Sequence, residues 1–167
     1  MPAPPSRMHI RSEREDDRSS IRRVITDAFG QQAEADLVDH LRADGDLAIS
    51  LIAEQDDEVV GHIALSRLKS PDGALALAPL CVAPSRQRCG IGSALVRQAI
   101  EEARRCQSGI VFVLGDPDYY TRFGFSAVVA ARFACRFSGP NFMALLPGDG
   151  NIASGPVVYP DAFSSLE

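Results

Sequence analysis

The chain has 167 residues, of which 46% are hydrophobic, so it is long enough to fold as one domain with a full core. Residues 1–7 are too short and too polar for a signal peptide, and no apolar run approaches the roughly 18 residues of a membrane span, so we expect a cytoplasmic protein without membrane contact. The formal net charge of −5 argues against a nucleic-acid partner and favours a cationic partner, such as an amine.

The cysteines and histidines argue against a metal site. The four cysteines show no C-x-x-C spacing, and the three histidines are scattered along the chain. We therefore expect neither a structural metal nor a disulfide. The oligomeric state, including a homodimer, stays open.

The N-terminal half predicts an alternation of strands and amphipathic helices. Apolar residues at helical spacing run from Ile21 to Phe29 and stop at Gly30, and a second set marks a helix that closes near Gly45. A turn at residues 31–34 separates the two helices. The expected strands are residues 9–11, 47–53, 59–68 and 75–82, with the second and third joined as a hairpin.

The strand at residues 75–82 contains Pro79, which cannot donate a hydrogen bond to a neighbouring strand. We therefore expect a bulge or a lapse of pairing at this position. A proline at a harmless sheet edge is the alternative.

A glycine-bearing loop, residues 87–93, follows this strand and leads into a long amphipathic helix. Amides at a helix start lack partners and carry the positive end of the helix dipole, so they bind anions. Gly90 and Gly92 allow a phosphate to approach the backbone, and Arg88 adds a positive charge. No lysine follows Gly92 as in a P-loop, and Leu95 stands where a dinucleotide-binding loop has a third glycine. A plain tight turn is the alternative interpretation.

The C-terminal half completes the predicted sheet. The apolar run at residues 109–114 predicts a central strand covered on both faces. The other expected elements are an amphipathic helix at 91–106, a short helix at 118–125 ended by Gly124, and strands at 133–137 and 142–146.

Two motifs resemble those of a known family. Gln-x-x-Gly-x-Gly at residues 87–92 resembles the pyrophosphate loop of the GNAT superfamily of acyl-CoA-dependent N-acyltransferases. Tyr119-Tyr120-x-x-x-Gly124-Phe125 resembles its second hallmark, aromatic-Tyr-x-x-x-Gly-Phe, and residues 116–125 are similar to the YhbS-like subgroup of predicted acetyltransferases. The resemblance implies an α/β GNAT domain at residues 8–146, whose mixed central sheet has a splayed, bulged strand and flanking helices. A C-terminal arm, residues 147–167, would pack on this domain.

The resemblance also implies roles for particular residues. Leu80, Cys81 and Val82 would pair with the pantetheine arm of the cosubstrate acetyl-CoA, and the Leu80 N–H would act as an oxyanion donor. Tyr120 would protonate the leaving thiolate. The pyrophosphate would lie against the loop and the helix start, at Gln87, Arg88, Cys89, Gly90, Ile91, Gly92 and Ser93.

The amine would approach from the face opposite CoA, beside the loop that follows the first helix. Glu34 or Asp36 is our candidate for attracting a cationic amine there.

The chain departs from the family pattern at two places. Many relatives carry a carboxylate general base early in the bulged strand, where this chain has Ala76 and no acid between residues 75 and 82. Water, His62, Glu54 and Glu34 are the candidates for the base, and a buried, structural role is the alternative for His62. The second departure is Asp116-Pro117, which stands where many relatives have an asparagine that contacts the cofactor. Cys89, at a helix start, is either reactive or passive.

We therefore expect an N-acetyltransferase that moves an acetyl group from acetyl-CoA to a primary amine by direct attack, without a metal. A catalytically weak or inactive acyl-CoA-binding regulatory module is one alternative. A phosphate-ligand binder with no acyl chemistry is the other.

Overall fold

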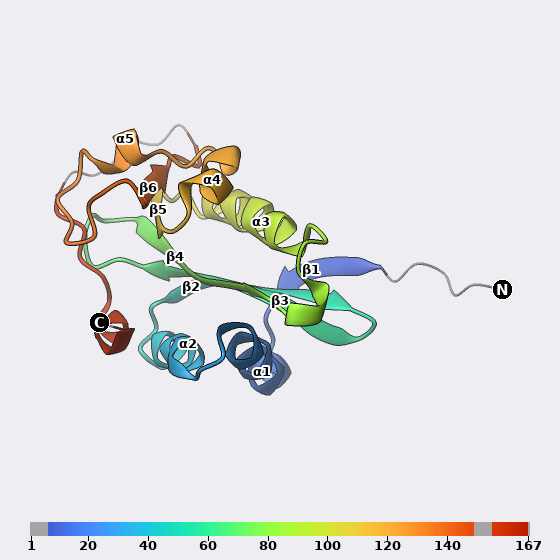
Figure 1. The fold of residues 1–167 in the computed structure, drawn as a ribbon. Helices are drawn as coiled ribbons and strands as arrows, with labels where there is room; N and C mark the ends of the chain where they lie inside the picture. Colours follow the sequence, from blue (N-terminus) through green and yellow to red (C-terminus); the bar gives the residue numbers. More distant parts are fainter. Residues whose placement is uncertain (1–6, 149–154, 167) are drawn as a thin grey trace.

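The computed structural model describes residues 7–148 and 155–166, and within them a six-stranded sheet with strand order β1-β2-β3-β4-β5-β6 forms the centre (Figure 1). Neighbouring strands are antiparallel except β4 and β5, which are parallel. This mixed sheet confirms the predicted α/β fold class. The strands are β1 (Met8–Ser12), β2 (Leu47–Gln55), β3 (Glu58–Arg67), β4 (Ala74–Val82), β5 (Ile110–Leu114) and β6 (Phe142–Leu145).

Helices cover both faces of the sheet, with α3 on one face and α1 and α2 on the other (Figure 1). Because strand side chains alternate between faces, Leu51 and Ile63 pack with α3 while Ile52 and Ala64 pack with α1 and α2. The α-helices are α1 (Arg18–Phe29), α2 (Ala33–Ala43), α3 (Ile91–Arg105), α4 (Pro117–Tyr120) and α5 (Ala127–Ala130). Short 3-10 turns are η1 (Glu15–Asp17), η2 (Pro84–Arg86), η3 (Thr121–Phe123) and η4 (Asp161–Leu166).

Strand β4 is bulged and then parts from β5. Ile63 of β3 pairs with Leu80, and Leu65 pairs with Leu77, so Ala78 and Pro79 together stand opposite a single residue. The parallel pairing of β4 with β5 covers residues 74–77 and does not continue past Leu77. The missing N–H of Pro79 explains the bulge, and the predicted lapse of pairing is confirmed.

One predicted turn and one predicted strand differ from the structure by more than a residue at their ends. The turn predicted at residues 31–34 is shorter, because Ala33 and Glu34 already belong to α2. The strand predicted at 133–137 is an irregular segment whose Phe133 is buried edge-on against Phe112, with ring centres 5.2 Å apart. Phe133 therefore packs over β5 and β6, and its segment does not add a strand to the sheet.

The described part of the predicted C-terminal arm, residues 155–166, packs on the sheet and on α2. Val158 forms an isolated bridge with Ser70, and Phe163 of η4 packs with Leu37 and Leu41 of α2. The rest of the predicted arm, residues 149–154 and Glu167, lies outside the described residues. Within the described ranges, no helix combines the length and apolar character needed to cross a membrane.

Candidate functional site

The loop between β4 and α3 has the backbone of an anion-binding turn. Arg88 and Gly90 both adopt left-handed conformations, with φ of 64° and 85°. Amides in turns of this kind form a concave surface that binds anions. Gly90 is the N-cap of α3, and no side chain in the described part of the chain caps this helix. The first amides of α3 and the positive end of its dipole are therefore left for an anion.

A cleft of about 530 Å³ opens beside this loop. Its β4 wall is the part of the strand that has parted from β5, so the cleft continues the split in the sheet. The walls come from four segments: Ala28 and Phe29 at the end of α1; Leu80, Cys81 and Val82 of β4; Gln87, Arg88, Gly90, Gly92 and Ser93 of the loop and α3; and Tyr119 and Arg122 of α4 and η3.

Eight of the ten residues expected to contact CoA, all except Cys89 and Ile91, line this cleft. Cys89 is exposed and does not line it, and the side chain of Ile91 is buried in the core beneath α3. Gln87 turns back toward the sheet, and its Nε2 donates a hydrogen bond to the Val82 carbonyl at 3.2 Å. Gln87 thereby connects the loop to the end of β4.

The sequence motifs did not identify four of the residues that line the cleft, namely Ala28, Phe29, Tyr119 and Arg122. The Arg122 guanidinium lies 4.9 Å from the centre of the Tyr119 ring, which is within cation–π distance. Arg122 and Arg88 give the cleft two positive charges, and none of the described residues that line it is a carboxylate. Arg122 could have been identified from the sequence, because it is a basic residue inside the aromatic motif at residues 119–125.

The two glycines of the cleft wall differ in the space around them. A Cβ added at Gly92 would come within 2.9 Å of the Tyr119 hydroxyl, so any side chain there must displace the tyrosine. At Gly90 an added Cβ would meet nothing within 4 Å, but its positive φ favours glycine. Glycine is therefore required at position 92 because Tyr119 lies so close, and at position 90 because of its backbone conformation.

Tyr120 does not line the cleft but lies directly behind Tyr119. Its ring packs edge-on against Tyr119 and Phe125, with centres 5.0 and 5.7 Å away. A Cβ at Gly115, the residue after β5, would come within 2.6 Å of the Tyr120 ring. Burial, with a smaller effect of Tyr119, raises the pKa of Tyr120 to about 12, so the phenol keeps its proton at neutral pH.

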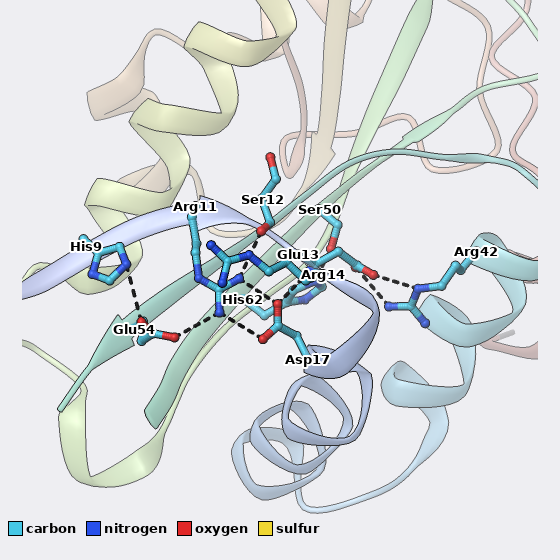
Figure 2. Close-up of polar contacts among 10 residues, drawn as sticks. All are labelled: His9, Arg11, Ser12, Glu13, Arg14, Asp17, Arg42, Ser50, Glu54 and His62. Atoms are coloured by element: carbon cyan, nitrogen blue, oxygen red, sulfur yellow. Dashed lines mark hydrogen bonds and ion pairs between the residues drawn. The ribbon is translucent and has the colours of Figure 1, made fainter. Parts of the chain in front are cut away.

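His62 is fully buried in the sheet beneath α1 and α2, and the described residues that line the cleft do not include it. Its Nε2 lies 2.8 Å from the Ser50 hydroxyl, which in turn donates to Glu13, and Glu13 accepts from Arg42 at 2.9 Å (Figure 2). Nδ1 has no hydrogen-bond partner among the described residues. Burial lowers the pKa of His62 to about 4, which makes the imidazole neutral and a weak base.

Glu54 belongs to a separate ion-pair cluster at the start of α1 (Figure 2). Arg11 donates to Glu54 at 3.0 Å and to Asp17 at 2.7 Å, and Glu54 also faces His9. The hydrogen bonds from Arg11 lower the pKa of the Asp17 carboxyl. These contacts join β1, β2 and α1, and they leave Glu54 engaged in structure.

Glu34 and Asp36 lie on α2 and do not line the cleft. Asp36 accepts from Arg22 at 2.6 Å, so its charge is already paired, whereas Glu34 accepts only from the neutral amide of Gln31 among the described contacts. Asp116 caps α4 by accepting from the Asp118 amide at 2.9 Å. In this chain the Asp116-Pro117 pair thus starts a helix.

The bulged and splayed strand, the uncapped helix start and the basic cleft define the class of acyl-CoA-dependent acyltransferases. The sequence profile of the Acetyltransferase (GNAT) family matches residues 14–125, and the chain belongs to this family. Within the described ranges, no group of three His, Cys, Asp or Glu side chains is arranged to hold a metal ion.

The relatives include two uncharacterised N-acetyltransferases of Escherichia coli K12. YjhQ is 44% identical over 116 residues, which span 65% of this chain and 64% of YjhQ, less than two thirds of that protein. YhbS is 33% identical over 136 residues, spanning 79% of this chain and 81% of YhbS, and these matches confirm the resemblance to the YhbS-like subgroup.

Two solved structures share the fold over nearly the whole chain. A GNAT family acetyltransferase from Brucella melitensis, in complex with acetyl-CoA, is 38% identical with a TM-score of 0.81, and the match covers 94% of this chain and 98% of that one. E. coli YhbS, in complex with CoA, is 30% identical with a TM-score of 0.88, covering 98% and 96%.

Proposed function

We propose that this protein transfers the acetyl group of acetyl-CoA to a primary amine by direct attack. The observation that carries the proposal is a single cleft that joins an uncapped helix start, two arginines and the opening between β4 and β5. The acetyl-CoA and CoA complexes of the two related structures support the same ligand.

The cleft residues fit the charge and shape of this ligand. The amides of residues 88–93 and the Arg88 and Arg122 guanidiniums would hold the pyrophosphate, beside the Tyr119 hydroxyl that lies against Gly92. The backbone of Leu80, Cys81 and Val82, which β5 no longer covers, would pair with the pantetheine arm.

The chemistry follows from the thioester, which supplies an activated acetyl group. The amine nitrogen forms a bond to the carbonyl carbon, and the Leu80 N–H donates to the oxygen that becomes negative. The carbon–sulfur bond then breaks, and the Tyr120 hydroxyl gives its proton to the departing thiolate. We assign removal of the amine proton to water, since His62 is buried and Glu54 is paired.

Calorimetry with acetyl-CoA and with ATP, followed by detection of CoA release with a panel of amines, tests the proposal. We expect acetyl-CoA to bind, ATP to bind far more weakly, and at least one amine to release CoA. Binding without release for any amine would identify a regulatory acyl-CoA-binding module instead. Equal binding of ATP would identify a general phosphate-ligand binder.

Gly92→Val tests the position of the ligand. The added side chain should weaken acetyl-CoA binding by about 1–3 kcal/mol, because it displaces the Tyr119 hydroxyl into the cleft and keeps phosphate away from the amides. Gly148→Val is the matched control, since a Cβ there would meet only an ordinary contact at 3.8 Å. An unchanged affinity in folded Gly92→Val protein would remove the loop from the binding site.

A further inference from the structure

Leu114 lies one residue beyond the last pair between β4 and β5. That pair joins Leu77 of β4 to Val113 of β5, whereas on its other side Leu114 still pairs with Phe142 of β6. The next residues along β4 are Ala78 and Pro79, which form the bulge. Leu114 therefore stands at the apex of the split, where the two strands begin to part.

The side chain of Leu114 faces away from α3. Val113 packs with α3, and strand side chains alternate between faces, so Leu114 shares the opposite face with Phe112. Phe112 is fully buried there between Phe133 and Phe142, with ring centres 5.2 and 5.3 Å away. This aromatic cover ends before Leu114, which is 50% exposed. The apex thus presents an open apolar side chain on the face opposite α3.

Phe29, the last residue of α1, borders the opening on the same face of the sheet. Ala28 packs on the cluster beneath α1 and α2 that contains Cys81 of β4, so the end of α1 lies over the parted half of that strand. Phe29 lines the cleft and is 41% exposed. Apolar surface is therefore available on the β4 side of the opening as well as on the β5 side.

The proposed position of the cosubstrate directs its acyl end toward this apex. The anion-binding loop follows Val82, and the pantetheine arm would run along β4 from Val82 to Leu80, whose N–H would hold the thioester oxygen. The same direction leads from Leu80 to Pro79 and Ala78 at the apex. Carbon atoms attached beyond the thioester carbonyl would therefore lie beside Leu114.

We propose that Leu114 is the contact surface for the acyl chain, and that the site binds propionyl and butyryl thioesters of CoA more tightly than the acetyl thioester. The proposal rests on the proposed acyl-CoA-dependent function and adds to it the range of acyl donors. The extra methylenes of a butyryl group would cover the exposed half of the Leu114 side chain. Each methylene that leaves water against apolar surface increases affinity about fourfold.

Calorimetry with acetyl-CoA, propionyl-CoA and butyryl-CoA tests this proposal without an acceptor. We expect Kd to fall along the series, with butyryl-CoA bound at least fourfold more tightly than acetyl-CoA. Leu114→Asn keeps the approximate size of the side chain but makes it polar. In this variant the ratio of the two Kd values should fall below about two, while Kd for acetyl-CoA stays within about twofold of the wild-type value.

Leu146→Asn is the matched control. Leu146 is 43% exposed, and it follows Leu145, whose pairing with Val111 places it toward the other end of β5. This variant should keep the wild-type ratio of Kd values. An equal loss of the ratio in Leu146→Asn would overturn the proposal, because the effect would then not depend on the apex of the split.

The acyl contact and the enzyme activity can fail separately. If butyryl-CoA binds no more tightly than acetyl-CoA to the wild type, or if Leu114→Asn keeps the wild-type ratio, the role of Leu114 is overturned while transfer from acetyl-CoA stands. If no amine releases CoA, the transfer fails, and the Kd ratios still decide the role of Leu114. If none of the three thioesters binds to the folded protein, both proposals are overturned.

Discussion

At the scale of single residues, the adjacent tyrosines Tyr119 and Tyr120 occupy different places. The Tyr119 hydroxyl lies against Gly92 in the cleft, whereas the Tyr120 ring lies against Gly115 at the end of β5. Neighbouring residues of a helix point about 100° apart, so one of the pair meets the loop and the other meets the strand end. The two tyrosines therefore face different parts of the structure, Tyr119 toward the glycine loop and Tyr120 toward the end of β5.

Tyr120→Phe should therefore slow the chemical step and leave acetyl-CoA binding nearly unchanged. General acid catalysis is worth ~10²–10⁴-fold, and we expect the low end because a thiolate leaves readily. Because the pKa of Tyr120 is raised to about 12, the wild type should show no loss of kcat from phenol ionisation up to pH 10. Tyr119→Phe is the matched control and should change acetyl-CoA affinity more than kcat. A Tyr120→Phe enzyme with wild-type turnover, where chemistry is rate-limiting, would show that Tyr120 is structural.

Burial of His62 makes stability depend on pH in a defined window. An unfolded imidazole takes up a proton below about pH 6.5, but the folded one does not until its pKa of about 4. The unfolded state thus binds more protons between these values, and the free energy of unfolding should fall by on the order of 2 kcal/mol from pH 7 to pH 5. Urea unfolding at both pH values measures this change.

His62→Gln isolates the contribution of this group, and His40→Gln, at an exposed position, is the control. The first variant should lose most of the change between pH 7 and pH 5, although its stability at pH 7 is lower. The second should keep the change. Glu13 should not contribute to the change between pH 7 and pH 5. Its burial would raise its pKa, but hydrogen bonds from Arg42 and Ser50 lower the pKa overall. An equal pH-dependent loss in His62→Gln would assign the effect to other groups.

At the scale of elements, the position of α3 depends on Gly61 of β3. A Cβ at Gly61 would come within 3.0 Å of Leu95, 3.1 Å of Ile91 and 3.2 Å of the Cys81 carbonyl. Gly61→Ala should therefore push the first turn of α3 away from the sheet and destabilise the fold by about 1–3 kcal/mol. Acetyl-CoA affinity should fall as well, because the same turn carries the anion-binding amides. Chemical denaturation measures the loss of stability and calorimetry the loss of affinity, with Gly148→Ala as control. An unchanged acetyl-CoA affinity in Gly61→Ala would show that the packing of α3 on Gly61 does not position the anion-binding loop.

Most elements could be predicted because their apolar residues follow a clear period. The face of α3 repeats through Leu95 and Ala99, and the apolar run of β5 is buried on both faces, so local pattern and packing agree. The segment 133–137 is apolar for a different reason, since Phe133 covers Phe112 across the sheet. Its periodicity resembles that of a strand, and only tertiary contacts distinguish the two.

The candidate site was less predictable wherever a side chain's partner lies far away in the sequence. The glycine loop is local, so its residues could be identified from spacing. Tyr119 lines the cleft because of its contact with Gly92, which the motif does not encode. Likewise, the pairing of Asp36 with Arg22 depends on how α1 and α2 pack together.

At the scale of the whole molecule, a net charge of −5 coexists with a cleft that carries Arg88 and Arg122. The surrounding negative field should draw a cationic amine toward the protein. Glu34 is our candidate contributor, because Asp36 is already paired with Arg22. Glu34→Gln should lower kcat/KM for an amine about two- to threefold at low ionic strength, and the difference should vanish in 0.5 M salt, where the Debye length is a few ångströms. The matched charge change Asp16→Asn, at an exposed position of η1, should have less effect. Equal losses in both variants would indicate only a net-charge effect.

The strand order of the sheet has a consequence for how the protein forms during synthesis. Strands β1 to β4 are antiparallel neighbours in both sequence and space, so β2, β3 and β4 can each pair soon after they leave the ribosome. The parallel partner of β4 arrives only after α3 has crossed over, because a parallel connection needs a long crossover. The cleft wall at Tyr119 and Arg122 comes later still. A nascent chain released after Val82 should therefore hold the hairpin strands without ligand affinity, and acetyl-CoA can stabilise the protein only once synthesis has passed Arg122.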